Sequence, residues 1–128
     1  TLATLTFTRD HCPTTRAVFK IDDDMVLHPK NIFEQDDFTK VAIYGRIARN
    51  LPVVRAEKSK WYMSTVSYAK ATYPPYAFGS AYVVSTRTLG PLVEAAETTC
   101  EYTHIEDTFI TGIVAEKAEV PLEHRKNW

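Results

Sequence analysis

The stretch AVFKIDDDMVL, residues 17–27, determines how the rest of the chain is interpreted. An apolar run rich in strand-forming residues leads into Asp22, Asp23 and Asp24, and then resumes as Met-Val-Leu. Three adjacent negative charges at the end of a strand are costly unless a positive partner lies on them. Mg²⁺ and Mn²⁺ favour carboxylate oxygens and often share them with substrate phosphates. The stretch therefore predicts a cation site for a diphosphate, and a solvated acidic turn is the alternative.

The composition indicates one small globular domain. The 128 residues are enough for one hydrophobic core, and 45% of them are hydrophobic. Fifteen Lys and Arg balance sixteen Asp and Glu, so the net charge of −1 gives no reason to expect nucleic acid or an anionic membrane surface as a partner. No apolar run reaches the roughly 18 residues that a membrane span needs. Because Thr1 is not a natural start, we expect a piece of a longer protein. Cys12 and Cys100 fit one disulfide or two free thiols.

The pattern of apolar residues predicts several helices and strands along the chain. Expected strands cover residues 16–21 and 41–45, and a further strand ends at 83–85. Expected helices cover 1–11 and 86–98, with Cys12-Pro13 ending the first. A short helix begins at Pro29 and ends at Asp36-Asp37, and another helix follows Asp107.

Two neighbouring segments have unusual composition. Residues 46–60 are rich in Arg and Lys, which predicts either a solvated loop or a positive flank for phosphates or an acceptor sugar. Residues 61–85 are rich in aromatic residues and hold seven of the chain's fifteen. Tyr73-Pro74-Pro75-Tyr76 is a rigid turn with two amphipathic rings, and aromatic rings with polar tips suit the apolar face of a sugar. The small residues Gly79-Ser80-Ala81 that follow would let a ligand approach the backbone. At least half of these aromatic residues are expected to be core material.

A second acidic pair, Glu106-Asp107, precedes apolar residues that recur at helical spacing. Ionised carboxylates are favoured at a helix N-terminus by the helix dipole, so an ordinary structural role explains them. The functional interpretation is a general base at the mouth of the helix, facing the cation site.

Four segments in order resemble one family. They are FKIDDD (19–24), KWYMS (60–64), YPPYAFGSAYVVS (73–85) and EDTFITG (106–112). The chain resembles the β-1,3-galactosyltransferases and β-1,3-N-acetylglucosaminyltransferases of glycosyltransferase family 31, which are related to Fringe, over nearly its whole length.

The resemblance implies a GT-A fold, an α/β sandwich that binds a nucleotide-sugar. Residues 1–128 would be the central and C-terminal part of one such domain, with the upstream nucleotide-binding strands and a membrane signal-anchor outside this chain. The implied enzyme acts on the lumenal side of the Golgi membrane in glycosylation. With Mn²⁺ (or Mg²⁺) it would move galactose or an N-acetylhexosamine from a UDP-sugar to the 3-hydroxyl of a glycoprotein or glycolipid glycan, with inversion.

The same resemblance implies roles on the donor side. Asp24 would be a direct ligand of the metal. Asp22 would hold the ribose or a metal-bound water, and Asp23 would also belong to the donor site. Lys20, which leads into the triplet, would position it. The remaining metal ligand is expected beyond residue 128, and His124 is not assigned to the metal.

On the acceptor side, Asp107 would take the proton from the attacking hydroxyl and Glu106 would orient the acceptor or the base. The residues implied to line the sugar sites are Trp61, Tyr76, Gly79 and Ser80. Thr108 stands where the family usually has Val, and Ser80-Ala81 follows Gly79 where a second glycine is common, which predicts a tighter wall.

Two other classes of function are open at this point. A non-catalytic relative could bind sugars with the same fold, although the retained carboxylates argue against it. A Ca²⁺ module fits poorly, because the aspartate triplet lacks the glycine and the alternating carboxylates of an EF-hand loop.

Overall fold

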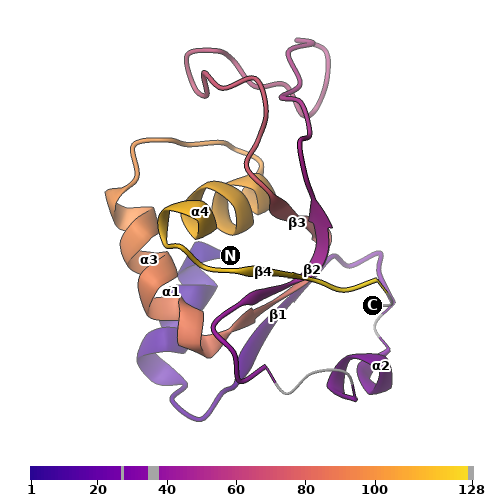
Figure 1. Ribbon diagram of the computed structural model, residues 1–128, viewed down its shortest axis with the longest axis vertical. Coiled ribbons are helices and arrows are strands. Elements are labelled where there is room, and N and C mark those ends of the chain that lie inside the picture. The colour runs from indigo at the N-terminus through magenta and orange to yellow at the C-terminus, as the bar shows by residue number, and fades with distance from the viewer. Residues whose placement is uncertain (27, 35–37, 127–128) are drawn as a thin grey trace.

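A computed structural model describes residues 1–26, 28–34 and 38–126. In this part of the chain a mixed sheet has four strands in the order β1-β3-β2-β4 (Figure 1). The strands are β1 (Ala17–Ile21), β2 (Ile43–Ala48), β3 (Tyr76–Ser85) and β4 (Leu122–His124). β3 runs antiparallel to both β1 and β2, whereas β4 lies parallel to β2. The fold is α/β, as predicted, and it is consistent with a GT-A-like arrangement.

Side chains alternate between the two faces of the sheet, and both faces of the central strands β2 and β3 pack against other elements. On one face Ile43, Tyr82 and Val84 join the largest core cluster, and on the other Tyr44 and Val83 pack with the segment that follows α2. The central strand β3 is therefore a nearly continuous apolar run, as expected for a strand covered on both sides.

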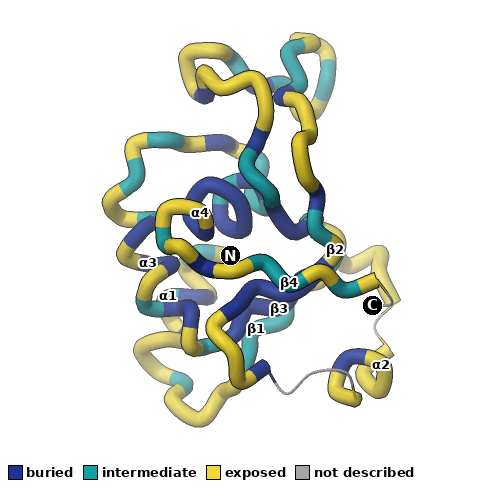
Figure 2. The backbone as a smooth tube through the Cα atoms, in the orientation of Figure 1, coloured by how far each residue is buried: buried dark blue, intermediate teal, exposed yellow. Residues whose placement is uncertain are grey.

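Most helices cover one face of the sheet (Figures 1 and 2). They are α1 (Leu2–His11), the 3₁₀ turn η1 (Thr86–Thr88), α3 (Leu89–Thr98), the π-helix η2 (Thr108–Val114) and its continuation α4 (Ala115–Lys117). Leu5, Leu92 and Val114 bring three of these helices into the same core cluster. The short α2 (Pro29–Phe33) covers the opposite face through Ile32.

Most elements expected from the sequence are present, with some differences at their bounds. The helices after Thr1 and Ser85 and the strand before the aspartates are confirmed. β2 begins two residues later than predicted and extends three residues further. β4 was not predicted, because three residues carry too little pattern. Asp36-Asp37, the predicted end of α2, lies outside the described residues. Both cysteines are free thiols, and Cys100 is exposed.

The long connection from β2 to β3, residues 49–75, projects from the sheet (Figure 1) and has its own small core. Val53, Met63 and Tyr68 pack there against Tyr73. The Arg55 guanidinium donates three hydrogen bonds, of 2.7, 2.8 and 2.8 Å, to the carbonyl oxygens of residues 63, 68 and 70. Arg55 thus holds the connection together, so this part of the basic segment is neither solvated loop nor phosphate flank.

Within the described residues, every helix is too short or too polar to cross a lipid bilayer.

Candidate active site

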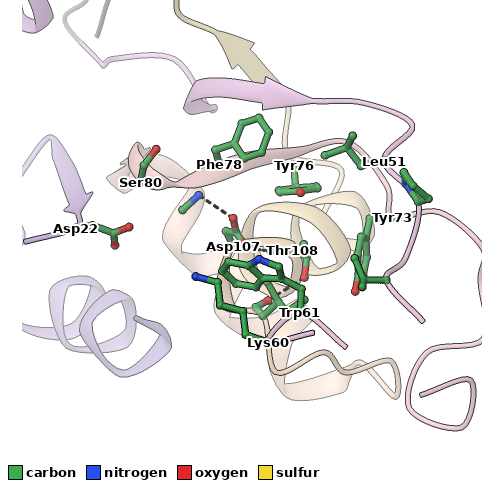
Figure 3. A pocket seen from close by; sticks show the side chains of 14 residues that line it. Asp22, Leu51, Lys60, Trp61, Tyr73, Tyr76, Phe78, Ser80, Asp107 and Thr108 are labelled. Carbon is green, nitrogen blue, oxygen red and sulfur yellow. Dashed lines mark hydrogen bonds between the residues drawn. The ribbon is translucent and has the colours of Figure 1, made fainter. Parts of the chain in front are cut away.

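A pocket of about 620 Å³ lies where β3, the start of η2, the end of β1 and the 49–75 connection meet. Its wall is mainly apolar and aromatic, with a few polar groups, which is the usual character of a small-molecule site. In Figure 3, Asp22 lies at one side, Asp107 near the middle, and Tyr73 of the connection at the other side.

Asp107 is a pocket carboxylate whose position is fixed by backbone hydrogen bonds. It caps η2, and each of its oxygens accepts one backbone hydrogen bond: Oδ2 from the Gly79 N–H at 2.7 Å and Oδ1 from the Thr108 N–H at 2.8 Å. Burial raises the pKa of the Asp107 carboxyl, while these two N–H groups oppose the rise. A fixed carboxylate with a raised pKa, facing a pocket, is suited to accept a proton.

Glu106 has a different environment from its neighbour. It accepts a hydrogen bond from the hydroxyl of Tyr82, a buried residue of β3. Burial raises the pKa of the Tyr82 phenol, and the neighbouring Glu106 charge raises it further. Among the described residues that line the pocket, Asp107 is present and Glu106 is not. Glu106 therefore contacts the sheet rather than the pocket, and its negative charge raises the pKa of Asp107.

The aspartate triplet follows the last residue of β1. The Asp22 N–H donates to the Ser80 carbonyl at 3.0 Å, which continues the pairing of β1 with β3. The Lys20 ammonium donates to Asp22 Oδ1 and also to the Gly79 carbonyl oxygen. Asp22 lines the pocket, whereas Asp23 and Asp24 are exposed outside its described lining.

The three carboxylates are hard oxygen donors, so their chemistry fits a divalent cation such as Mn²⁺ or Mg²⁺. Their geometry supplies only part of a coordination shell: nowhere in residues 1–26, 28–34 and 38–126 do three His, Cys, Asp or Glu side chains converge on one point. Phosphate oxygens, water or other groups would have to complete the shell.

Aromatic rings form much of the pocket wall. Tyr76 packs edge-on against Tyr73 and Phe78, with ring centroids 6.1 and 5.6 Å apart. Trp61 is half exposed, and the Lys60 ammonium lies 4.4 Å from its ring centroid. Burial raises the pKa of the Tyr76 phenol to about 12, so Tyr76 stays neutral. Trp61 is thus a half-exposed ring at the pocket, whereas Tyr76 is a buried wall.

The sequence matches the family described as Galactosyltransferase over residues 1–126. The chain belongs to the galactosyltransferase family. The match confirms the resemblance to glycosyltransferase family 31 and covers every residue placed in the pocket.

Galactosyltransferase-family relatives of this chain carry N-acetylglucosaminyltransferase names. One is the lactosylceramide 1,3-N-acetyl-beta-D-glucosaminyltransferase of Xenopus tropicalis, 33% identical over 123 residues, which cover 89% of this chain and 31% of that protein. The human protein of that name is 32% identical over 120 residues, covering 89% of this chain and 32% of its own length. The rat UDP-GlcNAc:betaGal beta-1,3-N-acetylglucosaminyltransferase 7 is 33% identical over 103 residues, covering 78% and 26%. The chain thus spans about a third of the length of these curated relatives.

The structure brings most residues that the family resemblance singled out to one pocket. Six of them line it together: Asp22, Trp61, Tyr76, Gly79, Ser80 and Asp107. Four of the singled-out residues are outside its described lining: Lys20, Asp23, Asp24 and Glu106. Lys20 donates a hydrogen bond to Gly79, which lines the pocket, and Glu106 accepts one from Tyr82.

Tyr73 was recognised in the sequence as an amphipathic ring of the turn before Tyr76, but it was not among the residues expected to line the sugar sites. Its ring lines the pocket, and its buried hydroxyl has no hydrogen-bond partner within the described part of the chain. Burial also raises the pKa of this phenol. Its place in the aromatic segment was visible in the sequence, but which tyrosines of that segment face a cavity depends on how the connection folds back.

Proposed function

We propose that this chain carries the acceptor side and part of the donor side of an inverting UDP-sugar β-1,3-glycosyltransferase. The observation that supports it most is Asp107: a mostly buried, twice hydrogen-bonded carboxylate with a raised pKa, in a pocket that Asp22 also borders. The family membership makes glycosyl transfer the reaction class.

In the proposed reaction, Asp107 takes the proton of the acceptor 3-hydroxyl while that oxygen attacks the anomeric carbon of the donor sugar. The new bond joins the acceptor oxygen to the anomeric carbon, and the bond from that carbon to the phosphate oxygen breaks. The electron pair leaves with UDP, and attack from the opposite side inverts the anomeric configuration. Glu106, held by Tyr82, would orient the base by its position next to Asp107.

On the donor side, Asp24 and Asp22 would hold Mn²⁺ or Mg²⁺, with Asp23 and Lys20 in the same donor region. The cation would neutralise the diphosphate of the leaving UDP. The chain itself contributes acidic oxygens at the end of β1, next to the Gly79-Ser80 wall of the pocket.

The sugar would lie against the aromatic and small residues of the wall. Trp61 is half exposed, Tyr76 forms a fixed wall, and the small residues Gly79 and Ser80 line the pocket. Aromatic faces pack well on the apolar faces of pyranose rings. The relatives' names favour N-acetylglucosamine as the donor sugar and a galactose-terminated glycolipid or glycan as the acceptor.

We further propose that this chain is part of a single GT-A domain that acts on the lumenal side of the Golgi membrane. A membrane anchor would lie outside residues 1–128. These proposals rest on the family and on the partial coverage of the relatives.

The test is release of UDP by the full native protein with three donors, UDP-galactose, UDP-N-acetylglucosamine and UDP-N-acetylgalactosamine, in Mn²⁺ or EDTA. We expect acceptor-dependent release with one donor, sensitive to EDTA, and loss of at least about a hundredfold of kcat in Asp107→Asn, within the range ascribed to a general base. Glu97→Gln, an exposed carboxylate of α3, is the matched control and should keep full activity. Normal turnover by Asp107→Asn would overturn the assignment of the base. UDP binding without release from any donor would instead indicate a sugar-binding relative.

A further inference from the structure

The Lys20 ammonium joins two parts of the pocket that are distant in sequence. Lys20 pairs with Tyr82 in the β1–β3 ladder, and its side chain is about three-quarters buried, with an exposed fraction of 24%. From there it donates to Asp22 Oδ1 on its own strand end and to the Gly79 carbonyl oxygen on β3. A single cation thus ties the aspartate triplet to the strand that borders Asp107.

Gly79 makes its second contact on the opposite side. Its N–H donates to Asp107 Oδ2 at 2.7 Å, while its carbonyl oxygen accepts from Lys20. The two peptide groups that flank the Gly79 Cα are therefore held from opposite ends, by a cation and by a carboxylate. Hydrogen bonds with a charged partner are roughly twice as strong as neutral ones, so these contacts fix where Gly79 lies.

Gly79 and Asp107 are in close contact, with little space for a side chain on Gly79. A Cβ added to Gly79 would lie 3.1 Å from Asp107 Oδ2 and 3.3 Å from its Cγ. Because the backbone already touches the carboxylate, a shift of Gly79 moves or releases Asp107. Whatever holds the Gly79 carbonyl therefore helps to hold the base.

We propose that Lys20 is a positioning residue for Asp107, acting through Gly79. This inference rests on the proposed function, and it gives Lys20 a task beyond the donor side. Lys20 does not touch the reacting atoms in this proposal. It holds the Gly79 peptide so that the N–H of Gly79 points at Asp107.

The groups around Asp107 give this proposal a specific signature in the pH profile. Burial and the Glu106 charge raise the pKa of Asp107, and the N–H groups of Gly79 and Thr108 lower it. Tyr73, Tyr76 and Tyr82 are neutral phenols whose pKa values the Asp107 charge raises, and Lys60 and Asp22 line the same pocket as Asp107. Loosening Gly79 weakens the largest of the contacts that lower this pKa, so the pKa of Asp107 should rise and the acidic limb of kcat/KM should move to higher pH.

The experiment is a double-mutant cycle in the full native protein, with Lys20→Met, Gly79→Ala and both changes together. Initial rates would be measured against donor concentration and against pH. We expect Lys20→Met to lower kcat about tenfold with the donor KM within about twofold, which corresponds to loss of transition-state stabilisation rather than of donor binding. The acidic limb of kcat/KM should move to higher pH. When Lys20→Met is added to Gly79→Ala, kcat should fall by clearly less than tenfold relative to Gly79→Ala alone.

Two further variants keep the test decisive. Lys20→Arg keeps a cationic donor and should recover most of kcat, and Lys117→Met, an exposed cation of α4, should resemble the wild type. A raised donor KM with unchanged kcat, or fully additive effects of Lys20→Met and Gly79→Ala, would overturn the role through Gly79 while leaving the proposed function intact. Absence of transfer by the wild type with every donor would instead overturn the proposed function.

Discussion

Replacing Gly79 with alanine is the sharpest perturbation that the pocket offers. Gly79 does not have a positive φ, so alanine fits the backbone of β3 without strain. The consequence of the change is steric and local. The added methyl would lie 3.1 Å from Asp107 Oδ2, which is closer than an ordinary van der Waals contact of 3.4–4 Å. Asp107 must therefore retreat by a few tenths of an ångström.

The expected loss can be derived from the contact that this retreat weakens. The Gly79 N–H to Asp107 Oδ2 bond is 2.7 Å long and involves a charged acceptor. A hydrogen bond of this kind contributes about 1.5–3 kcal/mol. Loss of about half of it amounts to about 0.75–1.5 kcal/mol, and 1.36 kcal/mol corresponds to a factor of about ten in rate. We therefore expect kcat to fall about three- to tenfold in Gly79→Ala.

The assay is acceptor-dependent release of UDP at saturating donor, together with thermal unfolding of each variant. Gly90→Ala is the matched control, because a Cβ at Gly90 in α3 meets no atom within 4 Å. This control should keep wild-type kcat and gain up to about 1 kcal/mol of stability, since alanine is the better helix residue. If Gly79→Ala is folded and its kcat stays within about twofold of the wild type, the close contact with Asp107 does not position the base.

Two further predictions concern the base and the 49–75 connection. Because burial raises the pKa of Asp107 and the base must be ionised to act, the acidic limb of kcat/KM should lie above the ordinary aspartate value of 3.8; a limb at or below it in initial-rate measurements would show that a different group titrates. Arg55→Met removes three hydrogen bonds to carbonyl oxygens, so the connection should become a site of rapid limited proteolysis and the unfolding free energy should fall by about 1–3 kcal/mol. Lys58→Met, an exposed cation of the same connection, should resist proteolysis as the wild type does; equal cleavage of both variants would refute the role of Arg55.

The candidate site was partly predictable from the sequence. Asp22 and Asp107 are 85 residues apart, and the chemistry of each could be inferred from its neighbours: a carboxylate after a buried strand, and a carboxylate before an amphipathic helix. Their presence around one pocket could only be expected through the family resemblance. The antiparallel pairing of β1 with β3 brings the end of β1 beside Ser80, and the contact of Gly79 with η2 then completes the link to Asp107.

The long-range contacts were not predictable in the same way. The carbonyl oxygen that Lys20 binds belongs to a residue 59 positions away, and the phenol that holds Glu106 is 24 positions away. Side-chain direction at these positions depends on strand register, because a shift of one residue turns each side chain to the other face of the sheet. The three carbonyl oxygens bound by Arg55 depend likewise on how the connection folds back, for which a basic segment without periodicity has no signature.

Through its family resemblance the sequence indicated the class of the fold. By itself it determined most helices and strands and the residue types that carry the chemistry. These follow from local causes: apolar periodicity, proline breaks, and carboxylates placed at the ends of elements. The tertiary structure decided which of those residues meet. It brought Asp22, Trp61 and Asp107 to one pocket, turned Glu106 toward Tyr82, and put Lys20 between the aspartate triplet and Gly79. The physical reason is that packing and strand register act between segments far apart in the chain, whereas propensity and periodicity act within a few residues.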